Sequence, residues 1–194
     1  MSTPQASRSD LSAPIVREAT DADIPAIQKI YARHVLTGLA SFEEVPPDQD
    51  KIAKRMHEIR SRGLPYLVST RSDAAGQNAV CGFAYASPFR SRSAYRYTVE
   101  DSVYVASDVI GQGHGRALLG ALVVRCSELG YRQMIAVIGD SANAASIGLH
   151  RNMGFAETGS MPAVGFKFGR WVDSVRMQRA LGPGSSTLPD DFEA

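Results

Sequence analysis

The chain has 194 residues, of which 44% are hydrophobic, as expected for one compact domain with its own core. A net charge of +1 argues against a nucleic-acid or anionic-membrane partner. Cys81 and Cys126 lie in apolar stretches without metal-ligand spacing, so we expect buried thiols in the reducing cytoplasm and no metal site. No segment is apolar over the length of a membrane span, and the N-terminus lacks the apolar region of a secretory signal.

Turn-forming and polar residues dominate both ends of the chain, and we expect flexible tails over residues 1–14 and 182–194. The folded domain is therefore expected over residues 15–181. It opens with a strand at residues 15–19. A helix follows, because apolar residues recur at helical spacing in the next segment: Ile24, Ile27, Ile30, Tyr31 and Val35.

A second helix is expected over residues 48–62, closed by Gly63. Strands follow at residues 66–70 and 79–86. The turn-rich segment 72–78 between them predicts a β-hairpin.

The second half of the domain begins with a basic and aromatic loop at residues 88–97, which leads into a strand at residues 98–105. The remaining pattern is helix, strand, helix, strand, strand, over residues 113–129, 133–138, 142–153, 155–161 and 172–180. Because helices and strands alternate without an internal repeat, the sequence predicts a mixed α/β fold.

A glycine-rich loop between the strand at residues 98–105 and the next helix is the most informative segment. It reads Gly111-Gln112-Gly113-His114-Gly115-Arg116. Glycine lets the backbone come close to a ligand, and the unpaired amides of a helix N-terminus bind phosphate without a basic patch. The loop therefore predicts a phosphate site, in agreement with the small net charge.

Two other interpretations of this loop remain at this point. A dinucleotide site is one, since Asp140 follows the next strand as a ribose-binding acid does in a Rossmann unit. However, Arg116 stands in the place of the third glycine of that motif, and the loop follows a hairpin. A glycine-rich turn without a ligand is the other.

Further segments stand in a fixed order along the chain: residues 15–20 (IVREAT), 98–105 (TVEDSVYV), 136–139 (AVIG), 143–150 (NAASIGLH), 154–155 (GF) and 165–171 (GFKFGRW). With the glycine loop, they resemble the GNAT superfamily, and within it the phosphinothricin and methionine sulfone or sulfoximine acetyltransferases. The resemblance covers residues 15–181. It implies a mixed, mostly antiparallel central sheet with a splayed acetyl-CoA-binding strand and flanking helices.

The resemblance also implies an acetyl-CoA-dependent N-acetyltransferase. The acetyl group would pass to the α-amino group of a small amino acid or analogue, by direct attack in a ternary complex. Two alternatives are a non-catalytic acyl-CoA-binding sensor module and an acetyltransferase of protein amines. A homodimer is expected, because the resembling enzymes build their sites near a two-fold interface.

By the same resemblance, the diphosphate of acetyl-CoA is expected on the loop from Gly111 through Gln112, Gly113, His114 and Gly115 to Arg116. The pantetheine arm is expected along Val103, Tyr104 and Val105, with Asn143 and Ser146 at the start of the following helix. An N-cap is the alternative role of Asn143. Ile110 departs from the superfamily, which usually has Gln or Arg there, so this side-chain contribution is absent.

Acetyl transfer to an amine needs a proton acceptor, and the leaving thiolate needs an acid. Glu100 matches the general base of the resembling enzymes. His150 falls where many superfamily members carry a tyrosine that protonates the sulfur, and the phosphinothricin-type enzymes have histidine there. Without the resemblance, Glu100 is compatible with a surface glutamate, and His150 with a structural or substrate-orienting residue.

An arginine fork suits the acidic group of an amino-acid substrate. The residues assigned to substrate binding precede or include the proposed base: Phe89, Arg90, Arg96, Thr98 and Glu100. Arg90 matches an arginine of the methionine sulfone enzymes, whereas solvated surface charge is the alternative for both arginines. Three aromatic residues are candidates for the pocket walls, with a place in the core as the more common alternative: Tyr31, Phe42 and Trp171.

Overall fold

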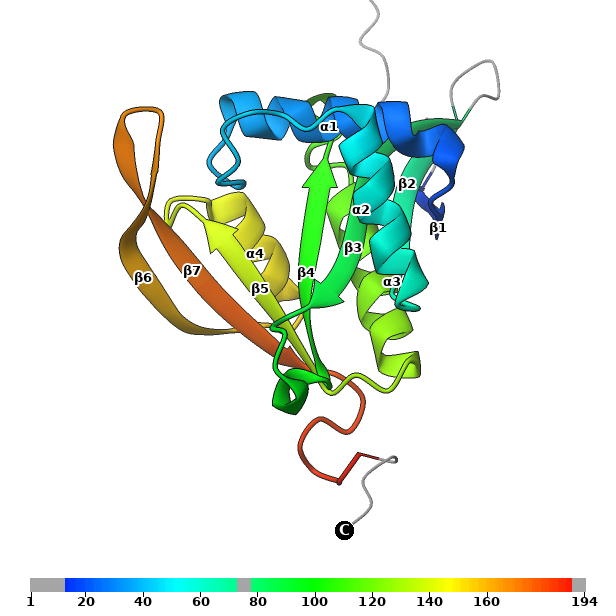
Figure 1. The fold of residues 1–194 in the computed structure, drawn as a ribbon, viewed down its shortest axis with the longest axis vertical. Coiled ribbons are helices and arrows are strands. Elements are labelled where there is room, and N and C mark those ends of the chain that lie inside the picture. The colour runs from blue at the N-terminus through cyan, green and yellow to red at the C-terminus, as the bar shows by residue number, and fades with distance from the viewer. Residues whose placement is uncertain (1–12, 73–77, 190–194) are drawn as a thin grey trace, which may run out of the picture.

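The computed structural model describes residues 13–72 and 78–189 (Figure 1). Its centre is a seven-stranded sheet in the order β1-β2-β3-β4-β5-β7-β6. The strands are β1 (Ile15–Glu18), β2 (Tyr66–Ser72), β3 (Asn78–Pro88), β4 (Thr98–Val105), β5 (Gln133–Gly139), β6 (Ala156–Lys167) and β7 (Arg170–Ala180). Neighbouring strands are antiparallel except for β4 and β5, which confirms the predicted mixed, mostly antiparallel sheet.

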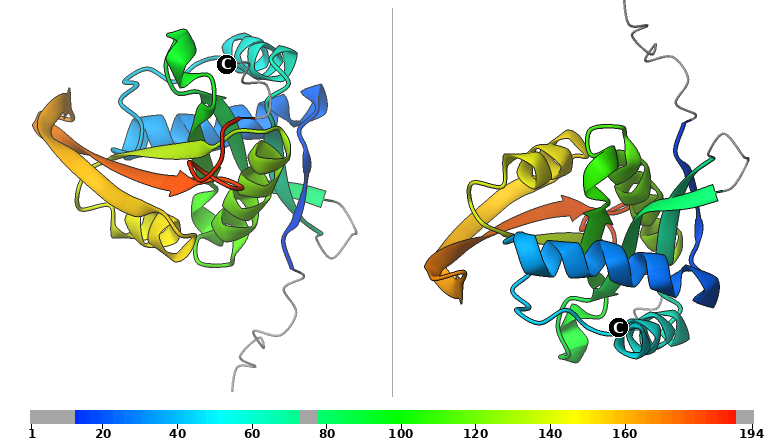
Figure 2. Two further views of the ribbon diagram at one scale, coloured as in Figure 1. Left: turned by 90° about the horizontal axis from the view of Figure 1, so that it is seen from below. Right: turned by 90° about the horizontal axis from the view of Figure 1, so that it is seen from above.

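Among the described residues, four α-helices flank this sheet: α1 (Ile24–Thr37), α2 (Gln49–Ser61), α3 (His114–Glu128) and α4 (Ala144–Asn152). Figure 2 shows α1 and α2 on one face and α3 and α4 on the other. The apolar stripe predicted for α1 is buried against the sheet at all five positions. Burial of side chains of this size stabilises the fold by roughly 1.5–3 kcal/mol each.

The parallel strands β4 and β5 pair over only a short stretch and then diverge. Residues 98–101 pair with residues 133–136, whereas β4 continues to pair with β3 as far as Val105. Residues 102–105 therefore present an unpaired backbone edge on the β5 side. The predicted splayed strand is confirmed, and Figure 1 shows the two strands diverging.

The hairpin of β6 and β7 is longer than the sequence predicted. The expected strand ended at residue 161, because Pro162 lacks a backbone N–H and reads as a breaker. In the structure β6 continues to Lys167, and its pairing with β7 shifts register between Met161 and Gly165, where Pro162 lies. The hairpin projects beyond the helices (Figure 1) and exposes a set of large apolar side chains: Val164, Phe166, Phe168 and Trp171.

The predicted tails at residues 1–14 and 182–194 fall largely outside the described residues, and their flexibility stays a prediction. Residues 182–189 form turns, and Arg132 donates hydrogen bonds of 3.0 Å to Thr187 Oγ1 and to the Leu188 carbonyl. The predicted hairpin of β2 and β3 is confirmed by its antiparallel pairing, although residues 73–77 of its turn lie outside the description. In the described part of the chain, no helix combines the length and apolar character needed to cross a membrane.

Candidate active site

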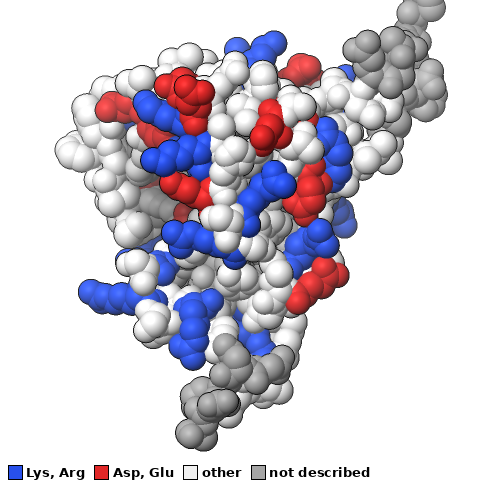
Figure 3. All heavy atoms as spheres, turned by 45° about the vertical axis from the view of Figure 1, so that its right-hand side comes forward, with Lys and Arg blue, Asp and Glu red and all other residues white. Residues whose placement is uncertain are grey.

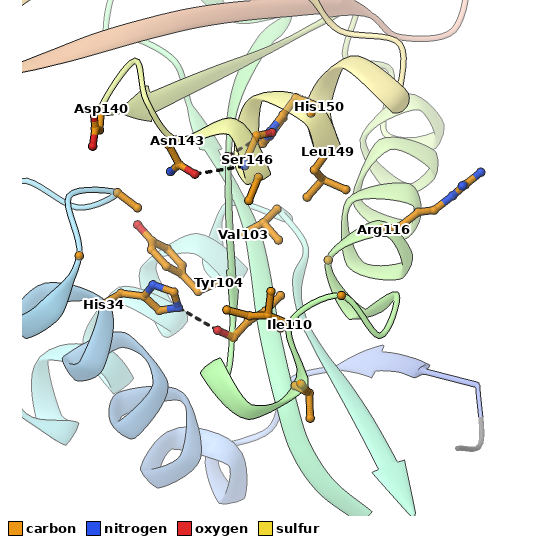
Figure 4. Close-up of a pocket in the computed structure, with 18 of the residues that line it drawn as sticks. His34, Val103, Tyr104, Ile110, Arg116, Asp140, Asn143, Ser146, Leu149 and His150 are labelled. Carbon is orange, nitrogen blue, oxygen red and sulfur yellow. Dashed lines mark hydrogen bonds between the residues drawn. The ribbon is translucent and has the colours of Figure 1, made fainter. Parts of the chain in front are cut away.

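A cavity of about 910 Å³ opens between the separated ends of β4 and β5. Its walls come from the end of α1 and the residues after it, from β4, from the glycine loop and from α4 (Figure 4). Most residues predicted to bind the cofactor line it: Val103, Tyr104, Val105, Gly111, Gly113, Gly115, Arg116, Asn143 and Ser146. The fold thus gathers residues from separate elements around one space.

The glycine loop presents its backbone to this cavity. Gly111 and Gly113 have φ angles of +81° and +90°, a left-handed conformation that strains any residue with a side chain. Gly113 is also the N-cap of α3, whose first-turn amides have no partner within the helix. Together with the helix dipole, these amides form a site suited to a diphosphate. Ile110 also lines the cavity and is 62% exposed, while Arg116 supplies a cation to the lining.

Two residues of the loop, Gln112 and His114, send their side chains elsewhere. Arg71 of β2 donates a hydrogen bond to Gln112 Oε1 at 2.9 Å. His114 is buried, with Nδ1 3.2 Å from Ser69 Oγ, and burial together with the charge of Arg71 lowers its pKa. These side chains hold the loop on β2, so at Gln112 and His114 only the backbone amides are candidates for phosphate contacts.

Side chains from two helices flank the unpaired edge of β4 (Figure 4). His34 of α1 donates from Nε2 to the Val105 carbonyl at 2.9 Å. Across the cavity, Asn143 Oδ1 accepts a hydrogen bond from the Ser146 amide at 3.2 Å, which makes Asn143 the N-cap of α4. The capping alternative stated for Asn143 is therefore correct, and this residue lines the cavity as well.

His150 lines the cavity but is buried and held at both ring nitrogens. Its Nδ1 lies 2.8 Å from the Ser146 carbonyl, and its Nε2 lies 3.0 Å from Asp101 Oδ2. A carbonyl oxygen can only accept, so Nδ1 carries a proton, and a second proton is shared with the carboxylate. Burial alone would lower the pKa of His150, but the hydrogen bond and charge of Asp101 outweigh it and raise that pKa. The pair is therefore a buried imidazolium and carboxylate that ties α4 to β4.

Glu100 lies on the opposite face of β4 from Asp101. Side chains alternate along a strand, so Glu100 shares its face with Tyr104, which packs against α1. Burial and the neighbouring Asp101 raise the pKa of the half-buried Glu100, while Arg90 opposes this effect. A carboxylate with a raised pKa is a stronger proton acceptor, as a general base for an amine requires.

Three of the five residues predicted to bind the substrate, Arg90, Arg96 and Thr98, line a second pocket of about 280 Å³, which is separate from the first. Phe89 and Glu100 do not line it. Its lining includes Arg62, Arg90, Arg92, Arg96 and Thr98. Among the described residues, no ion pair joins these arginines to a carboxylate. In Figure 3, Lys and Arg side chains gather at the lower left, apart from Asp and Glu. The guanidinium of Arg90 lies 5.0 Å from the ring centre of Phe89, which holds the arginine against the loop.

Glu100 lines neither pocket and stands between them along β4. Thr98 belongs to the arginine pocket, and Val103 to the large cavity. Since Arg90 acts electrostatically on Glu100, the arginine pocket lies within electrostatic reach of the proposed base. The structure therefore brings the predicted residues together as two neighbouring groups with Glu100 between them.

The three aromatic candidates for the pocket walls line neither pocket, so that expectation is wrong. Tyr31 is buried in the core, edge-on to Tyr104 at 4.9 Å between ring centres. Phe42 is 44% exposed, and Trp171 is 67% exposed on the hairpin of β6 and β7.

Comparison with known proteins agrees with this architecture. Residues 30–155 match the sequence profile of the Acetyltransferase (GNAT) family. The phosphinothricin N-acetyltransferase of Alcaligenes faecalis is 54% identical over 175 residues, which cover 90% of this chain and 86% of that protein. An L-methionine sulfoximine/L-methionine sulfone acetyltransferase of Pseudomonas aeruginosa is 45% identical over 174 residues, 88% of this chain and 96% of that protein.

A solved structure extends the agreement to three dimensions. The GNAT superfamily phosphinothricin acetyltransferase from Sinorhizobium meliloti, crystallised in complex with AcCoA, superimposes with a TM-score of 0.87. The two are 48% identical over 93% of this chain and 95% of that chain. The fold and site thus define an acyltransferase, and the chain belongs to the GNAT family. It is an acetyl-CoA-dependent N-acetyltransferase, as predicted, with acetyl-CoA as co-substrate, and the relatives do not favour a non-catalytic sensor.

The Asp101 and His150 pair predicts a pH-dependent stability. A histidine with a raised pKa in the folded state stabilises the protein fully below its unfolded pKa of about 6.5, and this contribution is lost as pH rises through the folded value. We expect Asp101→Asn to lower the free energy of unfolding by about 3–5 kcal/mol near pH 6, and by less near pH 9. Urea denaturation at both pH values measures this difference.

Glu18→Gln is the matched control, because it removes an exposed ion pair with Arg125. It should leave stability almost unchanged at both pH values. An Asp101→Asn cost that stays constant with pH would contradict the assignment of an ionised pair.

Proposed function

We propose that this enzyme acetylates the α-amino group of a small amino acid or analogue, of the phosphinothricin, methionine sulfone or methionine sulfoximine type. The observation that carries the proposal is the position of Glu100 between the cavity with the glycine loop and a pocket of arginines. A substrate with an amine and an acidic group fits this arrangement. The names of the two relatives described above support the same substrate class.

In this proposal, bound acetyl-CoA supplies the acetyl thioester. The protein binds and orients acetyl-CoA and the substrate, and it accepts a proton from the amine. The amides of the glycine loop hold the diphosphate, while the free edge of β4 and the start of α4 hold the pantetheine arm. Arg90, Arg96 and Thr98 bind the acidic group of the substrate, while the ring of Phe89 holds the Arg90 guanidinium in place. The C–N bond then forms as the C–S bond of the thioester breaks, and Glu100 accepts the proton of the attacking amine, directly or through water. CoA leaves as a thiolate, which takes its proton from solvent.

We assign His150 a positioning role in place of the acid role that the sequence suggested. Both of its ring nitrogens already contact acceptors of the protein, namely the Ser146 carbonyl and the Asp101 carboxylate. To protonate a thiolate, His150 would have to break one of these contacts. In the intact pair, the imidazolium fixes α4 beside β4 and so keeps the cavity open.

Glu100→Gln tests the proposed base, since it preserves shape and removes the proton acceptor. We expect kcat to fall by roughly 10²–10⁴-fold while the Kd of CoA stays nearly constant. A thiol-release assay with phosphinothricin, methionine sulfone, methionine sulfoximine and a peptide with a free N-terminus measures this change. Glu157→Gln, at an exposed glutamate, is the control and should retain full activity.

Two outcomes would contradict parts of this assignment. Near-normal kcat in Glu100→Gln would remove Glu100 as the base. Turnover of the peptide alone would replace small amino acids by protein amines as the substrate class.

Arg90→Met tests the electrostatic link between the two pockets. The positive charge of Arg90 holds down the pKa of Glu100, so its removal must raise that pKa further. We expect the acid limb of the kcat/KM profile to move to higher pH in Arg90→Met than in the wild type. Ionisation of the free amine is common to both enzymes and serves as the internal reference. An unmoved or lowered acid limb would refute the link.

We also infer a homodimer built on the hairpin of β6 and β7. The exposed rings of Phe166 and Trp171 lie 5.2 Å apart, and Val164 and Phe168 extend the apolar surface. Monomeric proteins rarely expose apolar patches of large extent, which usually mark interfaces. The resemblance favours a second copy of this chain as the occupant.

Trp171→Glu tests this inference, because a charge at the centre of the apolar surface should prevent association. We expect sedimentation velocity to give a dimer for the wild type and a monomer for Trp171→Glu. The control Leu36→Glu, at an apolar residue of α1 that is 58% exposed, should remain dimeric. A monomeric wild type would disprove the inference.

A cytoplasmic location is proposed as well. Both cysteines, Cys81 and Cys126, are free and buried, and burial raises the pKa of the Cys126 thiol to about 12. Free thiols of this kind suit a reducing compartment. Cell fractionation with antibodies to the protein tests the location.

A further inference from the structure

Lys167, in the GFKFGRW segment at residues 165–171, is a buried lysine that the proposed reaction does not use. It is 2% exposed and ends β6. Its Nζ donates hydrogen bonds to the Gly38 carbonyl at 3.0 Å and to the Ser41 carbonyl at 2.7 Å. Burial lowers the pKa of Lys167, while two carboxylates of the same neighbourhood, Glu44 and Glu43, oppose this effect. A buried charge is costly unless hydrogen bonds or an opposite charge compensate it, and the two backbone carbonyls supply this compensation for Lys167.

The two carbonyls belong to the connection between α1 and α2, and this connection forms part of the cavity wall. Gly38, Leu39 and Ala40 all line the cavity. In Figure 1 the connection passes close to the ends of β5 and α4. The connection is not part of a helix or strand, so the Gly38 and Ser41 carbonyls need another hydrogen-bond donor. Lys167 is that donor, and it thereby fixes the conformation of the connection.

Two glycines allow the same loop to come close to the sheet. A Cβ atom at Gly139, the last residue of β5, would lie 2.1 Å from the Leu39 carbonyl oxygen. A Cβ atom at Gly165 of β6 would lie 2.4 Å from the ring of Phe42. The connection therefore packs against the backbone of Gly139 and Gly165 and is hydrogen-bonded to the Lys167 ammonium.

The loop also reaches the face of β4 that carries Glu100. The Ser41 hydroxyl lies 3.0 Å from the Tyr31 hydroxyl. The ring of Tyr31 packs edge-on against Tyr104, which lies on the same face of β4 as Glu100. Movement of the loop would thus disturb the cavity wall and the side of β4 where the amine must approach. The glycine loop, in contrast, has no contact with Lys167 among the hydrogen bonds of the described residues.

We propose that Lys167 is a positioning residue, which holds the connection of α1 and α2 as a fixed wall beside the reacting groups. The proposal rests on the proposed function, because the wall is placed beside the site of amine attack. It assigns Lys167 no proton transfer. Its effect is to keep the wall formed by Gly38, Leu39 and Ala40 in one shape, so that the thioester, the amine and the base meet in reactive geometry.

Lys167→Met tests the proposal, since methionine fills similar space without a donor. We expect the amine KM to rise roughly tenfold or more. The Kd of CoA should change by less than about threefold, because the glycine loop proposed to hold its diphosphate has no hydrogen bond to Lys167. Cleavage by a glutamate-specific protease at Glu43 and Glu44 should become faster as the connection loosens. Lys167→Gln keeps an amide donor and should recover part of both properties.

Lys54→Met, at an exposed lysine of α2, is the control and should match the wild type in all three measurements. Fluorescence of Trp171, the one tryptophan of the chain, reports whether the hairpin stays intact. If Lys167→Met fails to fold, Phe42→Ala releases the same loop from Gly139 and Gly165 and must raise both the amine KM and the cleavage rate.

Unchanged cleavage in Lys167→Met, or faster cleavage with an unchanged amine KM, would overturn the proposal. A wild-type protein that turns over no amine would remove the proposed function instead. In that event the cleavage rates still decide whether Lys167 holds the wall.

Discussion

The separation of β4 from β5 is the constraint on which the rest of the site depends. Parallel pairing ends at Asp101 and Ala136, and the remaining half of β4 pairs with β3 alone, apart from the hydrogen bond of His34 to the Val105 carbonyl. The gap stays open because α4 stands over it. His150 ties this helix to Asp101, and a Cβ atom at Gly115 would lie 3.2 Å from Leu149, so α4 packs closely on the start of α3. Backbone groups without partners on the free edge favour a ligand that supplies them.

One short strand thereby serves three purposes, because its residues alternate between faces and its edge is free. Asp101 points to the α4 side and anchors the helix that frames the cavity. Glu100 points to the other side, where burial raises its pKa toward the range useful for a general base. The edge between these two faces is where the pantetheine arm is proposed to lie, which brings the thioester near the base without a dedicated binding domain.

The elements of the fold follow from local patterns in the sequence, and so does the glycine loop at the start of α3 for which a phosphate site is proposed. Helical spacing on α1, the turn-rich segment after β2 and the glycines of the loop each act within a few residues, so the sequence alone predicts them. The family resemblance added the splay of β4 and the candidate base, Glu100. The end of β6 was missed because Pro162 gives a local breaker signal that tertiary pairing with β7 overrides.

Contacts between distant segments escaped the sequence analysis. Lys167 meets Gly38 across 129 positions, Arg71 meets Gln112 across 41, and Asp101 meets His150 across 49. No sequence spacing predicts that the residues of these pairs are in contact, because each contact depends on how two elements pack. The role suggested for His150 shows the consequence, since its type and helical position gave no sign that Asp101 and Ser146 occupy both ring nitrogens.

Backbone amides at the start of α3 are proposed to bind the diphosphate of acetyl-CoA. Titration calorimetry of the wild-type protein with CoA, and with pantetheine, which lacks the diphosphate together with the 3′-phosphoadenosine, examines this binding. We expect saturable heat from CoA and an affinity for pantetheine that is weaker by about tenfold or more. Equal affinities for the two compounds, or no heat from CoA, would contradict it.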